Sequence, residues 1–147
     1  MSTSLKCQYG LRAMFELARH YGEGQIGIGE IAEVQAIPQR FLENIMNVLR
    51  RGGFVESRRG RNGGFFLAKK PEEITLGDIV KYIDGEIYSI DCEGEERRPR
   101  QCRLRGACVF LPVWREAKAA LEAVYYSKTL QDLLDAEKAL YPSDYSI

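Results

Sequence analysis

Three of the four cysteines lie close together in the sequence, and their chemistry sets the first question. Cys92, Cys102 and Cys108 follow the pattern Cys-x9-Cys-x5-Cys, whereas Cys7 lies near the start of the chain. Thiolates bind zinc and iron–sulfur clusters. The spacing matches neither the Cys-x2-Cys of common zinc modules nor the cysteine run of bacterial ferredoxins. The residues alone therefore leave a metal or cluster site, a thiol–disulfide site and unmodified thiols as alternatives.

The segment that carries these cysteines is highly charged and has no regular apolar pattern. It is acidic from Glu93 to Glu96 and basic from Arg97 to Arg105. Nearby arginines favour the thiolate form of cysteine and would offset the charge of a bound cluster. We expect residues 86–108 to form a loop.

A second group of polar and basic residues could bind a polyanion. We predict a helix over residues 28–34, a turn at Gln35–Ile37 and a second helix over 38–51 that begins at Pro38. This second helix has an apolar set that includes Phe41 and a polar face, a pattern typical of a helix-turn-helix. The hydrogen-bonding residues in the first half of its polar face are Gln39, Arg40, Glu43 and Asn44.

A basic hairpin is predicted directly after the second helix. Strands are expected over 54–58 and 64–68, and Asn62-Gly63 between them is a hairpin signal because both residues tolerate positive φ. Arg58, Arg59 and Arg61 lie at the tip, where they could contact phosphates or the minor groove. Together the two helices and the hairpin predict a winged helix-turn-helix that binds double-stranded DNA, although a solvated polar surface is the alternative.

Further helices are expected on both sides of this unit. One covers 8–21, with Ser4 as a possible N-cap, and another begins after Thr75 and ends before Gly85. A long helix is predicted over 110–126, and a short terminal helix begins at Thr129. Along the long helix, apolar residues step by 4, 3, 4 and 3, a heptad seam suited to packing against another long helix: Phe110, Trp114, Ala117, Leu121 and Val124.

Composition and charge narrow the function classes. The chain has 147 residues, 45% of them hydrophobic, and a formal net charge of zero. Residues 1–70 hold 11 Lys/Arg and 6 Asp/Glu (+5), and residues 71–147 hold 10 and 15 (−5), so a polyanion partner is expected for the first half. No membrane span or signal peptide is predicted, and we expect a cytoplasmic protein. With His20 as the only histidine and no catalytic motif, we do not expect an enzyme.

Several short motifs together resemble the Rrf2 family of bacterial winged-helix transcription regulators, in particular its IscR- and NsrR-like, cysteine-containing branch. The resemblance covers about residues 3–128. Its anchors are Lys6-Cys-Gln-Tyr9-Gly-Leu-Arg-Ala13, Glu30-Ile-Ala-Glu33, Ile37-Pro-x-x-Phe41-Leu-Glu43, Leu49-Arg50, Arg59-Gly60-x-x-Gly63-Gly64 and Cys102-x5-Cys108.

The resemblance implies a homodimer in which each long C-terminal helix crosses its partner. It also implies that Cys92, Cys102 and Cys108 hold a [2Fe–2S] or [4Fe–4S] cluster, because they lie where the ligands of cluster-binding members lie. The chain departs from the family in two respects. Nine residues instead of five separate the first two cysteines, and the positions that supply a fourth ligand in family members hold Leu111 and Gln8.

Cys7, next to Gln8, replaces a family glycine. We hypothesise that Cys7 supplies the fourth ligand, from its own or the other protomer, the alternative being a small buried side chain.

These observations predict a mainly α-helical fold with a small β-hairpin wing. The expected division is a DNA-binding domain over 1–84, a sensor loop over 85–109, and a dimerisation helix with a tail over 110–147. The predicted function is that of a dimeric repressor that binds an inverted-repeat operator under control of the cluster. The alternatives are a thiol–disulfide or zinc-dependent regulator of the same fold, and a regulator that acts through a protein partner.

Overall fold

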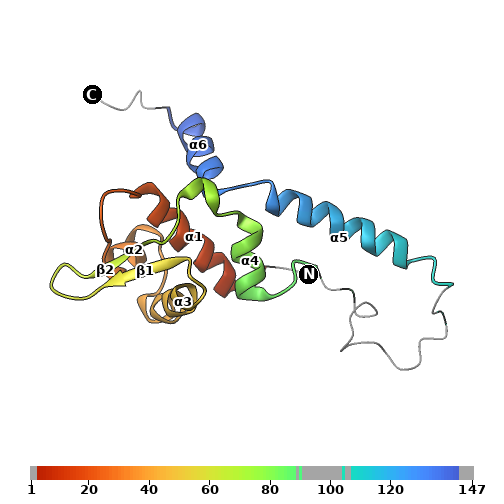
Figure 1. The fold of residues 1–147 in the computed structure, drawn as a ribbon, viewed down its shortest axis with the longest axis horizontal. Coiled ribbons are helices and arrows are strands. Elements are labelled where there is room, and N and C mark those ends of the chain that lie inside the picture. The colour runs from red at the N-terminus through yellow and green to blue at the C-terminus, as the bar shows by residue number, and fades with distance from the viewer. Residues whose placement is uncertain (1–2, 89, 91–103, 105–106, 143–147) are drawn as a thin grey trace.

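The computed structural model describes residues 3–88, 90, 104 and 107–142. In these ranges the chain forms helices α1 (Leu5–Arg19), α2 (Ile28–Val34), α3 (Gln39–Arg51), α4 (Leu76–Asp84), α5 (Leu111–Tyr126) and α6 (Leu130–Leu140). A hairpin of β1 (Val55–Arg58) and β2 (Gly64–Leu67) follows α3, and a short 3-10 helix, η1 (Pro71–Glu73), precedes α4. Figure 1 shows a body that contains α1 to α4, the hairpin and α6, with α5 extending away from it.

Helix α1 is the centre of the body. It packs against α2, α3, α4, α6 and β2. Its residues Ala13, Met14 and Leu17 are almost completely buried, and they join the core residues of the other elements. The positions of α3, the hairpin and α6 therefore all depend on α1.

The helix-turn-helix has the order predicted from the sequence. Helix α3 buries Leu42, Ile45, Met46 and Leu49, which recur at helical spacing. The hairpin is antiparallel, with Val55 opposite Leu67 and Arg58 opposite Gly64. A bridge between Ile26 and Phe65 also ties the segment before α2 to β2.

The turn of the hairpin is built differently from the prediction. The positive φ lies at Gly60 (122°), and neither Asn62 nor Gly63 has a positive φ. Gly63 is needed for another reason, since a Cβ there would lie 2.7 Å from the carbonyl oxygen of Arg58. The strong hairpin signal was correct, but close backbone approach rather than a two-residue turn requires glycine at position 63.

Helix α5 lies against the body only over its C-terminal half. Gly77 leaves room for the ring of Tyr126, and Lys118 pairs with Glu86 at 3.4 Å. No residue of α5 is buried in the single chain, and the seam residues Val124 and Phe110 are 60% and 58% exposed. The first turns of α5 extend beyond the end of α4 (Figure 1). None of the helices in the described ranges has the length and hydropathy of a membrane span.

Helix α6 returns to the body directly after α5. The amide of Leu76 donates to the carbonyl of Lys128 at 2.8 Å, and the amide of Leu130 donates to the carbonyl of Ile74 at 3.0 Å. Leu130 is fully buried in the core. The C-terminal end of α5 is thereby fixed to the body, while the predicted division at residues 84/85 and 109/110 stays a prediction.

The predicted element bounds differ from the observed ones by a few residues. Helix α1 begins at Leu5 rather than residue 8, because the Ser4 side chain accepts a hydrogen bond from the amide of Cys7 and caps the helix there. Pro38 is the N-cap of α3 rather than its first residue. Thr75 caps α4 as predicted, whereas Thr129, predicted as the start of the last helix, is the N-cap of α6; each side chain accepts from the amide three residues later.

Candidate nucleic-acid interface

The exposed side of α3 presents the predicted contact residues together. Gln39, Arg40, Glu43 and Asn44 are all exposed, since the opposite side of the helix is held in the core. Asn47 and Arg51 continue the same exposed side toward the C-terminal end. A helix whose polar side is free along its whole length, with amide, guanidinium and carboxylate groups on it, can enter the major groove of DNA.

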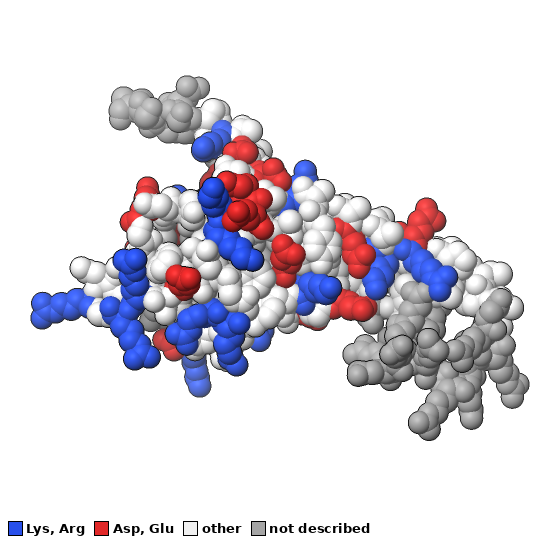
Figure 2. Space-filling model, in the orientation of Figure 1, with Lys and Arg blue, Asp and Glu red and all other residues white. Residues whose placement is uncertain are grey.

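The wing continues this surface. Arg58, Arg59 and Arg61 are exposed, and the guanidinium of Arg58 lies over the ring of Phe66 at 5.3 Å from its centroid. Arg50 of α3 donates to the Ser57 hydroxyl of β1 at 3.3 Å, which joins the two elements. Figure 2 shows blue side chains gathered at the lower left of the view, over α3 and the hairpin, while most red ones lie above them and along α5.

Three arginines of this surface are available to another charge in the part of the chain that the structure describes. Among the described residues, Arg40, Arg59 and Arg61 have no ion-pair partner. A guanidinium without an ion-pair partner can contact a phosphate without first breaking another ion pair. Its planar group of N–H donors matches a phosphate or the edge of a guanine. We name this surface, formed by the exposed side of α3 and residues 58–61, the basic face.

One residue of α3 is placed differently from the prediction. The apolar pattern of the helix predicts that Phe41 is buried, but its side chain is 61% exposed. Leu42, Ile45, Met46 and Leu49 fill the space against the body, so that Phe41, about 90° around the helix from their centre, remains at the border of the basic face. A Phe at the edge of an otherwise polar helix surface was not identified as functional because the apolar pattern alone predicts burial.

Cys7 is buried within the single chain. Its exposed fraction is 0%, and the carboxylate of Asp84 lies on the neighbouring helix end, where it accepts from the Ser4 amide at 2.9 Å. Burial, the charge of Asp84 and a hydrogen bond to that carboxylate raise the pKa of Cys7 to about 12. The thiol is therefore protonated at neutral pH, which favours the small-buried-residue alternative for Cys7 in this protomer.

The structure does not bring Cys7 and Cys108 together in one protomer. Thr3, one turn before Cys7, contacts Tyr125 at the C-terminal end of α5 with 3.4 Å between the hydroxyl oxygens. Cys108 precedes the N-terminal end of the same 16-residue helix, which is about 24 Å long. Cys108 is half-buried, whereas Cys92 and Cys102 lie outside the described residues. Within the described part of the chain, no three His, Cys, Asp or Glu side chains are grouped to hold a metal.

Comparison with known proteins identifies the family. The family model described as Rrf2, an iron-dependent transcriptional regulator, matches residues 3–136. The chain belongs to the Rrf2 family. It is 34% identical to the transcriptional regulator CymR of Bacillus subtilis over 145 residues, which cover 96% of this chain and 97% of CymR.

The solved structures of relatives agree with the fold. T. potens IscR superposes with a TM-score of 0.77 and 34% identity over 96% of this chain and 91% of that one. The structure of CymR, the global cysteine regulator of B. subtilis, gives a TM-score of 0.75 and 32% identity over 92% and 98%. The mainly helical winged fold is thus confirmed, and the chain is a transcription regulator rather than an enzyme.

The raised pKa of Cys7 predicts a stability change at alkaline pH. Since the folded state keeps a proton that the unfolded state releases above its ordinary pKa of 9.0, the stabilisation is complete below about pH 9 and is lost as pH rises toward 12. The free energy of unfolding of the wild type minus that of Cys7→Ala should fall by about 1.4 kcal/mol per pH unit in this window. Urea unfolding of both proteins at pH 8 to 11 measures it, and a constant difference would contradict the buried thiol.

Proposed function

We propose that this Rrf2-family regulator is a dimeric repressor that binds an inverted-repeat operator through the basic face. The observation that carries the proposal is the continuous surface of α3 and the wing, on which polar and basic side chains gather (Figure 2). A bacterial transcription regulator acts on DNA, so we place it in the cytoplasm.

The side chains of α3 suit the edges of bases in the major groove. Arg40 can donate two hydrogen bonds to guanine, and Asn44 can pair with the N6 and N7 of adenine. Glu43 can accept from the N4 amino group of cytosine. Gln39 stands at the first position of the helix, where a base or a phosphate is within reach. Arg58, Arg59 and Arg61 of the wing would then hold phosphates or enter the minor groove.

Phe41 adds an apolar contact to this set. The only apolar group on a base edge in the major groove is the 5-methyl group of thymine. Phe41 and Asn44 are three residues apart on α3 and therefore lie side by side on its surface, so the exposed Phe is suited to a thymine next to the base that Asn44 contacts.

Dimerisation would use the exposed side of α5. Its apolar seam residues remain solvent-exposed in one chain, and heptad spacing suits packing against an equivalent helix. The stacked rings of Phe110 and Trp114, 5.9 Å apart, form the first step of the seam. A twofold dimer presents the same basic face to each half of a duplex, which is why an inverted repeat is expected.

The sensor would be an iron–sulfur cluster held by Cys92, Cys102 and Cys108. Cys108 is only half-buried and immediately precedes α5, so a thiolate there is available to a shared site. Three thiolates suit iron–sulfur chemistry, and a bound cluster would supply a redox-sensitive tether between the loop and the dimer helix. The relative CymR of Staphylococcus aureus has a solved structure described as its oxidized form, which supports a thiol–disulfide site as the second candidate. Zinc binding and action through a protein partner remain outcomes of the tests.

Removing one wing arginine should weaken binding to DNA of any sequence. For Arg59→Ala, we expect a loss of affinity with the dimer intact and a salt dependence shallower by about one unit of slope, because one phosphate contact is lost. Lys138→Ala, which removes one positive charge from α6, is the matched control and should bind as the wild type does. Fluorescence anisotropy at several salt concentrations measures both, and an unchanged Arg59→Ala would contradict the wing assignment.

Thymine methyl groups should matter only while Phe41 is present. In a duplex selected by the wild type, replacing thymine by deoxyuridine in each half-site should weaken wild-type binding about fivefold, as expected for a lost methyl contact. The same replacement should leave the affinity of Phe41→Ala unchanged. If both proteins respond equally to deoxyuridine, Phe41 does not read the methyl group.

Cysteine substitution separates the sensor alternatives. Anaerobically purified wild type should contain iron and sulfide in matching amounts and show visible charge-transfer absorption, and Cys108→Ser should lose both. Cys7→Ser tests the fourth-ligand hypothesis, because unchanged iron content and absorption would exclude Cys7 as a ligand. Protein without iron that also fails reconstitution would overturn the cluster proposal, and a zinc assay or a disulfide in the same sample would identify the alternative.

A further inference from the structure

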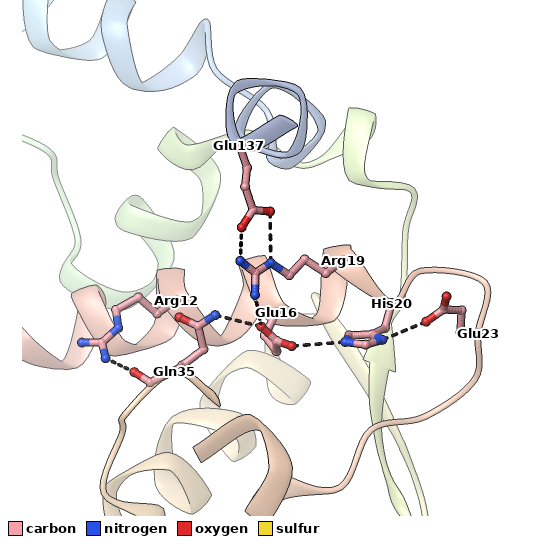
Figure 3. Close-up of polar contacts among 7 residues, drawn as sticks. All are labelled: Arg12, Glu16, Arg19, His20, Glu23, Gln35 and Glu137. Atoms are coloured by element: carbon pink, nitrogen blue, oxygen red, sulfur yellow. Dashed lines mark hydrogen bonds and ion pairs between the residues drawn. The ribbon is translucent and has the colours of Figure 1, made fainter. Parts of the chain in front are cut away.

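A buried carboxylate lies at the centre of a polar network on α1. Glu16 is 2% exposed and is the one buried charged residue in the described ranges. Its Oε2 accepts from Arg19 at 3.1 Å and from the Gln35 side-chain amide at 2.8 Å. Its Oε1 lies 3.2 Å from Nε2 of His20, whose Nδ1 is 2.8 Å from Glu23. Figure 3 shows these side chains converging on Glu16 from three directions.

This network holds the turn that positions the recognition helix. Gln35 ends α2, and Ala36 has a φ of 50°, which is unusual for a residue other than glycine. Arg12, one turn before Glu16, donates to the carbonyl of Gln35 and, at 3.3 Å, to that of Ala36. Arg12 therefore holds the main chain of the turn, and Glu16 holds the side chain of Gln35. The turn leads directly to Pro38, the N-cap of α3.

The same network reaches the helix that follows the dimerisation helix. Arg19 binds Glu137 of α6 through two parallel hydrogen bonds, from Nε at 3.1 Å and from Nη2. The guanidinium also lies over the ring of Phe15, 4.8 Å from its centroid. Because α6 follows α5 after residues 127–129, Glu137 lies on the element that connects α5 to α1.

We propose that Glu16 is a positioning residue for DNA recognition, which couples the placement of α6 to that of α3 through Arg19 and Gln35. The inference rests on the proposed DNA binding by α3. A buried carboxylate that loses one partner must find another, because an uncompensated buried charge is costly. Loss of the Glu137 contact frees Arg19 to reorient, which alters the field and hydrogen bonding at Glu16 and loosens its hold on Gln35.

Hydrogen exchange of the turn tests the coupling without DNA. The amides of Gln35, Ala36 and Ile37 are hydrogen-bonded at 3.0, 3.3 and 2.9 Å, respectively, so that their exchange reports the turn. In the full-length protein, Glu16→Gln and Glu137→Gln should raise exchange of a peptide covering 35–37 by about tenfold, while a peptide covering β2 keeps its wild-type rate. The matched controls are Glu23→Gln and Asp135→Asn, which should keep the wild-type exchange. Glu23 contacts the same His20 from the solvent side, and Asp135 contacts Gln131 within α6.

Affinity for DNA tests the positioning role. Glu137→Gln should weaken binding to a duplex that the wild type selects from a random pool by about fivefold and leave binding to a scrambled duplex unchanged; Asp135→Asn should change neither. Equal exchange of residues 35–37 in Glu137→Gln and the wild type would overturn the coupling. Faster exchange with unchanged affinity for the selected duplex would overturn the role in recognition. A wild type that selects no duplex would instead refute the proposed function, and the exchange result would stand separately.

Discussion

The burial of the apolar side of α3 against α1 is the constraint on which the candidate interface depends. It fixes the rotation of α3 about its axis, so the residues left for DNA are those opposite Leu42, Ile45 and Met46. A rotation by one residue would bury Asn44 in one direction, or Glu43 and Asn47 in the other, and is excluded by the cost of burying an unpaired polar group. The same helix α1 packs against β2 and α6, so the wing and the helix that follows α5 are positioned by one element.

The two apolar surfaces of the chain have different roles. The core of the body is complete within one protomer, whereas the seam of α5 is left exposed. A helix with no fully buried residue in its own chain has little stability of its own, so its length and heptad spacing make sense when an equivalent helix covers it. Helix α6 begins a few residues after α5 ends, and it packs on α1. In such a dimer, the angle at which the two α5 helices pack would therefore set the position of the body that holds α3.

Local signals were predictable from the sequence, and long-range contacts were not. The caps at Ser4 and Thr75 were predictable because a hydroxyl that bonds an amide three residues later is a local feature. The exposure of Phe41 depends on which four residues fill the space between α3 and α1. The hydrogen bond from Gln35 to Glu16 joins the C-cap of α2 to a residue of α1 that is 19 positions away in the sequence. For the cysteines the sequence supplies the donor types, while Cys92 and Cys102 lie outside the described residues and their joint role stays a prediction.

The central claim is that two copies of the basic face read a duplex with twofold symmetry. Selection of duplexes from a random pool by the wild-type protein, followed by determination of the protein-to-DNA ratio in the selected complex, tests it most directly. The account predicts enrichment of inverted repeats whose half-sites lie about one helical turn apart or a multiple of it, bound by an even number of protomers. Enrichment of no sequence, or binding of one protomer to an asymmetric site, would contradict it.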